Sequence, residues 1–203
     1  MSGMQLVLAS NNQGKLGELQ DLFAPLGVQL IAQGTVGVPE SPEPYRTFVE
    51  NALAKARNAA QHTGLAALAD DAGLCVNAFG GLPGVDTAFY ATQFGYPKGD
   101  DYNVTALLEQ MQGIGDRRAA LVSTLVAVRS VDDPEPLIAV GRAAGEITRE
   151  RLGDKGFGFD PVLWIPEFGK TFAQLDPAVK NAHSHRGRAA QLMLAMMRER
   201  WFA

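Results

Sequence analysis

Cysteine is almost absent from this sequence of 203 residues, in which Cys75 stands alone. An internal disulfide and a zinc site built from several thiolates are therefore excluded, and we expect a protein of the reducing cytoplasm. Positive charge is also scarce, because 18 Lys and Arg residues stand against 22 Asp and Glu, for a formal net charge of −4. This balance gives no general attraction for DNA or RNA, so we expect no nucleic-acid partner.

Long apolar runs and a basic leader are missing as well. The apolar run around residues 121–128 contains Ser123 and Thr124, and it is far shorter than the roughly 20 residues of a membrane-spanning helix. Residues 1–10 lack the basic and apolar regions of a signal peptide. We therefore expect no membrane partner. The content of 46% apolar and 20% charged residues is ordinary for a globular protein.

The spacing of apolar residues predicts that strands and helices alternate in the first half of the chain. Predicted strands cover residues 5–9, 28–32, 65–69 and 74–76, and predicted helices cover 15–23 and the segment between the capping box Thr47-x-x-Glu50 and Gly64. Four prolines and glycines follow Gly34 within the segment 34–46, which is predicted to be a loop.

The second half is richer in β-patterns. Its predicted elements are a helix at 101–112, β-segments at 119–129 and 137–144 that suggest an antiparallel pair, a glycine-rich loop at 153–161, a strand at 162–165, a short helix after Asp176-Pro177 and a last helix at 188–200. At roughly 150 residues per domain, the length predicts one domain over residues 1–203. We expect an α/β fold with a mixed sheet and flanking helices, in two lobes around a central cleft.

A polar turn between the first strand and the first helix is a candidate anion site. Its residues are Ser10, Asn11, Asn12, Gln13, Gly14 and Lys15. Backbone N–H groups at such a turn point outward, and the helix dipole favours an anion there. The segment is not a P-loop, because Ala9 replaces the first glycine and Leu16 follows the lysine. The alternative is a well-capped turn with a surface lysine.

Carboxylates offer a candidate metal site. Asp70 and Asp71 follow a predicted strand, where ligands of open α/β sheets bind. Mg²⁺ prefers one or two carboxylates together with substrate phosphates. Glu50 is explained by its capping box, whereas Glu43 has no evident structural role and is the better second carboxylate. The alternative for the aspartates is a turn that leads to Gly73.

Two further segments suit a nucleotide base. The first is the loop 156–161, in which Phe157 and Phe159 suit stacking, Gly158 allows close approach and Asp160 suits N–H donors. The second is Lys180 with Ser184-His185-Arg186-Gly187 at a helix junction. The alternatives are a tight turn with core aromatics and a solvated basic junction.

Together these segments resemble the Ham1 family of inosine triphosphate pyrophosphatases. The matching stretches are residues 8–19, 47–60, 67–88, 156–163 and 180–189, which occur in the family's order and spacing. The resemblance implies an elongated mixed α/β sheet with two lobes, and usually a homodimer. It also implies Mg²⁺-dependent hydrolysis of non-canonical purine nucleoside triphosphates (ITP, dITP and XTP) to the monophosphate and pyrophosphate, which cleanses the nucleotide pool.

The resemblance also implies roles for individual residues. Asp71 matches the proton acceptor and metal ligand, Glu43 falls near the other metal carboxylate, and Lys15 is expected to neutralise the triphosphate. Substrate-binding positions match Ser10, Asn11, Asn12, Gln13, Gly14, Lys15, Ala72, Phe157, Gly158, Phe159, Asp160, Lys180, His185 and Arg186. Two features depart from the family pattern: Ala72 replaces a usual serine, and Pro44-Tyr45-Arg46 replaces the usual stretch before Thr47.

The expected reaction is attack of water on the α-phosphorus, with Lys55 as a weaker second cation. Mg²⁺ is expected to be held by Asp71 with help from Glu43 or Asp70, and Asp71 or its neighbour is expected to take the proton of the water. Donors such as His185 and Arg186 favour a 6-keto purine over adenine, because an amino group would set donor against donor. Two other functions remain open. One is a non-catalytic nucleotide-binding regulator, and the other is a pyrophosphatase of the Maf type, which lacks the Gly-Phe-Gly-Phe-Asp and Ser-His-Arg-Gly motifs.

Overall fold

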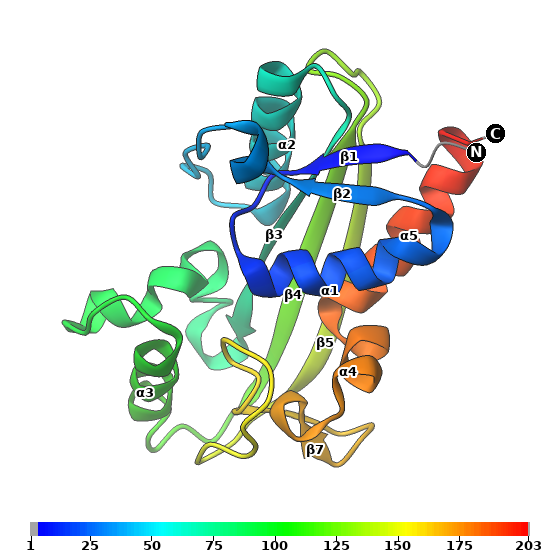
Figure 1. Cartoon of the computed structure of the whole chain (residues 1–203). Helices are drawn as coiled ribbons and strands as arrows, with labels where there is room; N and C mark the ends of the chain where they lie inside the picture. Colours follow the sequence, from blue (N-terminus) through cyan, green and yellow to red (C-terminus); the bar gives the residue numbers. More distant parts are fainter. Residues whose placement is uncertain (1–3, 203) are drawn as a thin grey trace. The chain divides into compact units, whose positions relative to one another are not determined.

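A computed structural model describes residues 4–202 of the chain (Figure 1). Its strands are β1 (Gln5–Leu8), β2 (Gln29–Ala32), β3 (Ala67–Val76), β4 (Arg118–Val128), β5 (Leu137–Ile147), β6 (Leu163–Ile165) and β7 (Lys170–Thr171). Its α-helices are α1 (Gln13–Phe23), α2 (Phe48–Thr63), α3 (Asp100–Gln110), α4 (Pro177–His183) and α5 (His185–Arg200). Short 3₁₀ helices connect several of these elements, and one of them covers Gly84–Phe94.

The strands form a seven-stranded sheet in the order β2-β1-β3-β4-β5-β6-β7. β1 pairs in parallel with β2 and β3, whereas β6 pairs antiparallel with β5 and β7. The prediction of an α/β fold with a mixed sheet and flanking helices is therefore confirmed. Within residues 4–202, no helix has both the length and the apolar character needed to cross a bilayer.

The chain divides into two compact units. Unit 1 contains Met1–Asp71, Ser123–Gly141 and His185–Ala203, and unit 2 contains Ala72–Val122 and Arg142–Ser184. Strands β3, β4 and β5 each contribute residues to both units.

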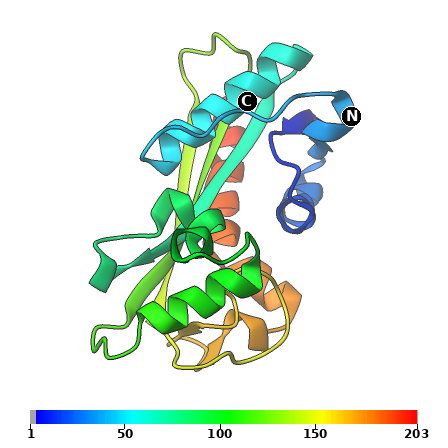
Figure 2. The ribbon, with the colours of Figure 1, turned by 90° about the vertical axis from the view of Figure 1, so that its left-hand side faces the viewer.

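Unit 1 has two apolar layers, because side chains along a strand alternate between the faces of the sheet. One layer joins Leu6 and Leu8 of β1 to α1 and α5 through Leu19, Phe23, Met193 and Met197. The other joins Val7 and Ala9 to α2 through Ala52, Ala56 and Ala59. In Figures 1 and 2, α5 (red) lies alongside α1 (blue). α1 and α5 thus cover one face of the sheet in this unit, and α2 covers the other.

The predicted caps of α2 are present. Thr47 Oγ1 accepts a hydrogen bond from the Glu50 backbone N–H at 3.4 Å. At the other end, Gly64 has a φ of +67°, in the left-handed region where glycine carries no steric penalty. These caps define the length of the helix that carries Lys55.

Unit 2 has a single large apolar cluster. It joins Leu74 and Val76 of β3 to Val104 and Leu107 of α3, and to residues around β6 and β7 such as Val162, Leu163, Ile165 and Phe172. Phe159, predicted at the sequence level to contact a base, is 3% exposed and belongs to this cluster. That prediction is corrected: the Phe159 ring packs in the core and is not presented to solvent.

Three predicted boundaries are also corrected. β3 is one strand through Asp70 and Asp71, not two strands with the aspartates at an end, because lysine side chains from outside the strand pair with both carboxylates. α1 begins at Gln13 because the Asn12 side chain caps it, and α5 already begins at His185.

Two glycines of unit 1 provide a matched test of this packing. A Cβ at Gly141 would clash with backbone atoms of His185 and Ala189 on α5, whereas a Cβ at Gly17 of α1 meets nothing within 4 Å. We expect Gly141→Ala to lower the free energy of unfolding by about 1–3 kcal/mol. Gly17→Ala should raise it by about 0.5–1 kcal/mol. Denaturant unfolding checks both, and equal effects would contradict the packing of β5 against α5.

Candidate functional site

The turn that leads from β1 into α1 is held by its own side chains. The Asn12 backbone N–H donates to Ser10 Oγ at 3.1 Å, and the Lys15 N–H donates to Asn12 Oδ1 at 3.0 Å. Asn11 Nδ2 donates to Glu40 Oε1 at 3.0 Å. Because Asn12 starts the helix, Lys15 lies in its first turn. Asn11, Asn12 and Gln13 are exposed, as an anion-binding turn requires.

The Asp70 carboxylate is buried in unit 1 and contacts three side chains. Ser123 Oγ donates to Oδ1 at 2.6 Å, Arg186 Nε donates to Oδ2 at 3.0 Å, and Lys15 Nζ lies 3.3 Å from Oδ2. Burial alone raises the pKa of this carboxyl, but the charges of Lys15 and Arg186 outweigh it and hold the pKa far below its usual range. Asp70 is therefore an ionised counter-charge with both oxygens already engaged.

Of the two cations beside Asp70, Arg186 is buried and Lys15 is half-buried. Arg186 is 3% exposed, and its Nη1 donates to Glu18 Oε2 at 2.5 Å. Glu18 lies one helical turn after Lys15 on α1. Burial lowers the pKa of Lys15, and the neighbouring positive charges of Arg186 and Lys55 add to this against the attraction of Asp70. The guanidinium of Arg186 is thus fixed in direction by two carboxylates.

Asp71 lies in a different environment, beside Lys55 of α2. Lys55 Nζ is 2.9 Å from Asp71 Oδ1, 3.1 Å from Glu43 Oε1 and 3.1 Å from the Asp70 carbonyl oxygen. Burial raises the pKa of the Asp71 carboxyl despite the opposing charge of Lys55, and the negative charge of Glu43 adds to the rise. Burial lowers the pKa of Lys55, but Asp71 and Glu43 outweigh it, so the net direction is upward.

Glu43 is carried by a loop that α2 holds in place. Buried Asn51 accepts a hydrogen bond from the Tyr45 N–H and donates to the Tyr45 carbonyl oxygen, each at 3.1 Å. The unusual segment Pro44-Tyr45-Arg46 is therefore tied to the helix that also carries Lys55. This explains how Glu43 reaches Lys55 although its side chain is 42% exposed.

The carboxylates fit a magnesium ion that is completed by phosphate and water. Asp71 Oδ2 is buried and accepts no hydrogen bond from the described residues, so it retains lone pairs for a ligand. Glu43 shares Lys55 with Asp71, whereas Asp70 has no uncommitted oxygen. Residues 4–202 contain no group of three or more His, Cys, Asp or Glu side chains placed to hold a metal. Mg²⁺, which keeps waters and binds substrate phosphates, suits such a sparse protein site.

In unit 2, the glycine-rich loop is organised around Asp160. Its Oδ2 accepts from Lys180 Nζ at 2.5 Å and from the Phe157 N–H at 3.0 Å. Lys180 Nζ also lies 4.7 Å from the centroid of the Phe157 ring, in cation–π contact. Lys180, Asp160 and Phe157 are thus brought together as predicted, although this oxygen of Asp160 already accepts two protein hydrogen bonds.

Two residues of the site were missed in the sequence. Ser123 lies in a largely apolar strand, where it and Thr124 are the buried hydroxyl residues. Glu18 follows Lys15 by three residues, the spacing at which helical side chains are neighbours. Neither feature identifies a partner before the fold is known. Among the predicted residues, unit 1 brings Lys15, Asp71, Glu43 and Arg186 into one network, and His185 is buried next to Arg186.

Removal of the Asp70 charge tests the role of this network in stability. Asp70→Asn leaves the buried Arg186 and the half-buried Lys15 without their shared counter-charge and should lower the free energy of unfolding by about 3–5 kcal/mol near neutral pH. The folded-state pKa of Asp70 is depressed, so its contribution is complete above the unfolded pKa of about 3.9 and declines as the pH falls further. Urea unfolding from pH 7 to pH 3 should therefore show a narrowing gap between the variant and the wild type. A gap that stays constant or widens in acid would contradict this.

The fold and these side chains define a mixed-sheet α/β protein whose cations and carboxylates suit a polyanionic ligand and a divalent metal. The Ham1 family model matches residues 6–196, and the chain belongs to that family. It is 74% identical over 199 residues to a dITP/XTP pyrophosphatase of Paracidovorax citrulli, covering 98% of this chain and 100% of that protein. A dITP/XTP pyrophosphatase of Albidiferax ferrireducens is 74% identical over 198 residues, with the same coverage.

Solved structures agree with this assignment. A HAM1 protein from Coxiella burnetii superposes with a TM-score of 0.87 at 42% identity, covering 96% of this chain and 99% of that one. The Ham1 protein of Staphylococcus aureus gives a TM-score of 0.84 at 35% identity, covering 96% and 98%.

Proposed function

We propose that the protein hydrolyses ITP, dITP and XTP to the nucleoside monophosphate and pyrophosphate. The observation that carries this proposal is the cluster of Lys15, Lys55, Asp71 and Glu43, in which one buried oxygen of Asp71 has no hydrogen-bond partner among the described residues. Relatives of the same length named dITP/XTP pyrophosphatase support the substrate class.

In the proposed reaction, Asp71 accepts a proton from the water that attacks the α-phosphorus, and pyrophosphate leaves. The raised pKa of Asp71 brings this carboxylate closer to the basicity that a general base needs near neutral pH. Lys15 and Lys55 neutralise phosphate oxygens. Local cations are needed for this because the chain as a whole has a net charge of −4. A bound Mg²⁺, held by Asp71 and Glu43, supplies charge neutralisation of the phosphates.

We further propose that Phe157 and Lys180 of unit 2 contact the nucleotide, and separately that His185 and Arg186 of unit 1 do. The Phe157 ring provides a stacking surface, and the donors favour a 6-keto oxygen over a 6-amino group. The carboxylates of Asp70 and Glu18 hold the guanidinium of Arg186 in one direction, which favours discrimination because a fixed donor cannot adapt to the wrong base. Ser10–Gly14, Ala72 and Gly158 are proposed to contact the substrate through their backbone or short side chains.

The assembly and location are also proposals. We propose a homodimer, which light scattering at micromolar concentration tests, since a monomeric mass would refute it. We propose that the reaction takes place in the cytoplasm, where nucleoside triphosphates are consumed.

A substrate panel tests the proposed function. Pyrophosphate release from ITP, XTP, dITP, GTP, ATP, dTTP and UTP should be fast for the first three and should require Mg²⁺. Preference for a pyrimidine substrate would point to a pyrophosphatase of the Maf type. Tight binding of ITP without pyrophosphate release would point to a non-catalytic regulator.

Asp71→Asn tests the proton acceptor. We expect kcat for ITP to fall by about 100-fold or more, because the amide is not basic, while the protein still folds and binds nucleotide. Asp21→Asn, an exposed aspartate of the same unit, is the matched control and should behave like the wild type. Near-wild-type turnover in Asp71→Asn would remove this residue from the mechanism.

Glu43→Gln tests the second metal carboxylate. The Mg²⁺ concentration for half-maximal activity should rise about tenfold or more, because the site loses one of its two charged ligands. Glu40→Gln is the control: Glu40 lies in the same loop but contacts Asn11, and the amide oxygen preserves that contact. An equal shift in both variants would mean that loop charge alone, and not ligation by Glu43, sets the requirement for Mg²⁺.

A further inference from the structure

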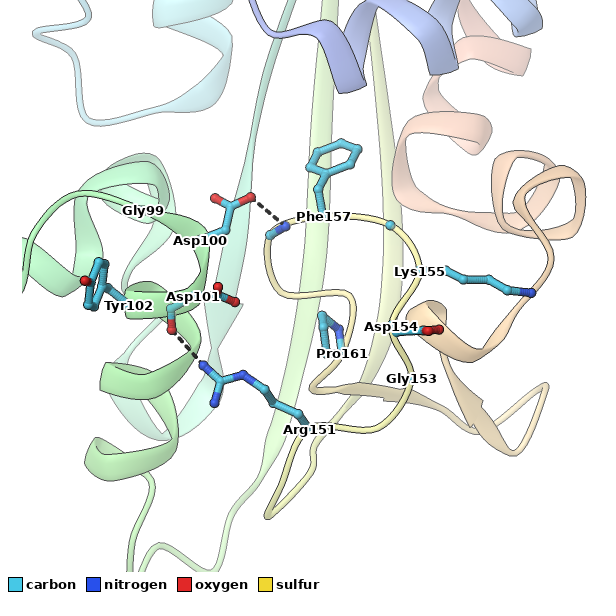
Figure 3. Close-up of a pocket in the computed structure, with 12 residues that line it drawn as sticks. Gly99, Asp100, Asp101, Tyr102, Arg151, Gly153, Asp154, Lys155, Phe157 and Pro161 are labelled. Atoms are coloured by element: carbon cyan, nitrogen blue, oxygen red, sulfur yellow. Dashed lines mark hydrogen bonds between the residues drawn. The ribbon is translucent and has the colours of Figure 1, made fainter.

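The tip of the glycine-rich loop that carries Phe157 borders a cavity. Between this loop and the first turn of α3 lies a cavity of about 570 Å³, lined by residues 99–102 and by the loop residues from Arg151 to Pro161 (Figure 3). Gly158, at the tip, has a φ of +61°, and a Cβ built there would meet nothing within 4 Å, so no side chain fills the space beside it. Because dispersion contacts need partner atoms at close range, packing does little to fix the tip of the loop.

Hydrogen bonds from α3 cross this space at two places. Asp100 Oδ2 accepts from the Gly158 N–H at 2.9 Å, next to Phe157 at the tip. Arg151, where the loop begins, donates from Nη2 to the Asp101 carbonyl oxygen at 2.7 Å and to Thr105 Oγ1 at 2.9 Å. Figure 3 shows the bond of Asp100 to the loop and the bond between Arg151 and Asp101 as dashed lines, with the Phe157 ring at the opposite end of the loop from Arg151.

We propose that Asp100 is a positioning residue for base recognition, which acts through the backbone of Gly158 to hold Phe157 in place. The inference rests on the proposed function, because Phe157 is the proposed stacking surface. Lys180 of α4 contacts the Phe157 ring through its ammonium group, and Asp160, which pairs with Lys180, accepts a hydrogen bond from the Phe157 backbone N–H. The tip is therefore held from α3 and from α4. Loss of the Asp100 contact removes the α3 side of this support.

The neighbouring Asp101 provides a control, because its substitution removes the same charge from the first turn of α3 without removing a side-chain contact to the loop. Both aspartates are exposed and lie in the first turn of α3, where a negative charge interacts favourably with the helix dipole. Only Asp100 uses its carboxylate to contact the loop. Asp101 contacts Arg151 through its carbonyl oxygen, which Asp101→Ala retains. The two alanine variants therefore differ in the loop contact but not in charge.

The experiment compares kcat and KM for ITP in Asp100→Ala, Asp100→Asn and Asp101→Ala. Asp100→Ala should raise KM about three- to tenfold, the value of one lost hydrogen bond, with a smaller change in kcat. Asp100→Asn retains an acceptor oxygen and should stay within about twofold of the wild type, as should Asp101→Ala. An unchanged KM in Asp100→Ala, or an equal rise in Asp101→Ala, would overturn the proposal.

A measurement that does not depend on catalysis separates the positioning role of Asp100 from the proposed function. In the nucleotide-free protein, amide hydrogen exchange at Phe157 should quicken in Asp100→Ala but not in Asp101→Ala, although the Phe157 N–H is bonded to Asp160 and not to Asp100. If the wild type fails to hydrolyse ITP while this exchange quickens, the proposed function is wrong and the support of the loop by Asp100 stands. Unchanged exchange at Phe157 in Asp100→Ala would overturn the positioning role whatever the activity.

Discussion

Unit 1 depends on the ion pairs and the hydrogen bond that the buried Asp70 carboxylate forms. This carboxylate joins Lys15 at the start of α1, Arg186 at the start of α5 and Ser123 in the middle of β4. These segments are distant in the sequence, and loss of the carboxylate would remove the counter-charge shared by the two cations and the acceptor of the buried Ser123 hydroxyl. One negative charge thus stabilises two cations that an apolar environment would otherwise disfavour.

The adjacent residue has a different role because a strand alternates its side chains between faces. Asp70 contacts side chains from α1 and α5, which cover one face of the sheet in unit 1, whereas Asp71 contacts Lys55 of α2, which covers the other. Asp70 has both oxygens engaged, while Asp71 keeps one buried oxygen without a hydrogen bond among the described residues. The same strand therefore presents a structural carboxylate and a proposed reactive one in succession.

The sequence predicted much of this arrangement, because its motifs mark local structure. The apolar periods located α1 and α2, the capping residue Thr47 marked the start of α2, and the motif around Lys15 indicated an anion-binding turn. The continuous course of β3 was not predictable, since two aspartates within a buried strand are tolerated only when cations from elsewhere neutralise them. For the same reason Glu18 and Ser123 were missed, and Phe159 was assigned to the site although the fold uses it in the core.

Direct titration of the two neighbouring carboxyl groups tests the central claim, which is that burial and charge give them opposite character. Carbon-13 NMR of the nucleotide- and metal-free protein, with Asp70→Asn and Asp71→Asn used to assign the signals, measures both pKa values. We predict a pKa for Asp71 above that of an ordinary aspartate and a pKa for Asp70 well below it. The reverse order, or two ordinary values, would contradict it.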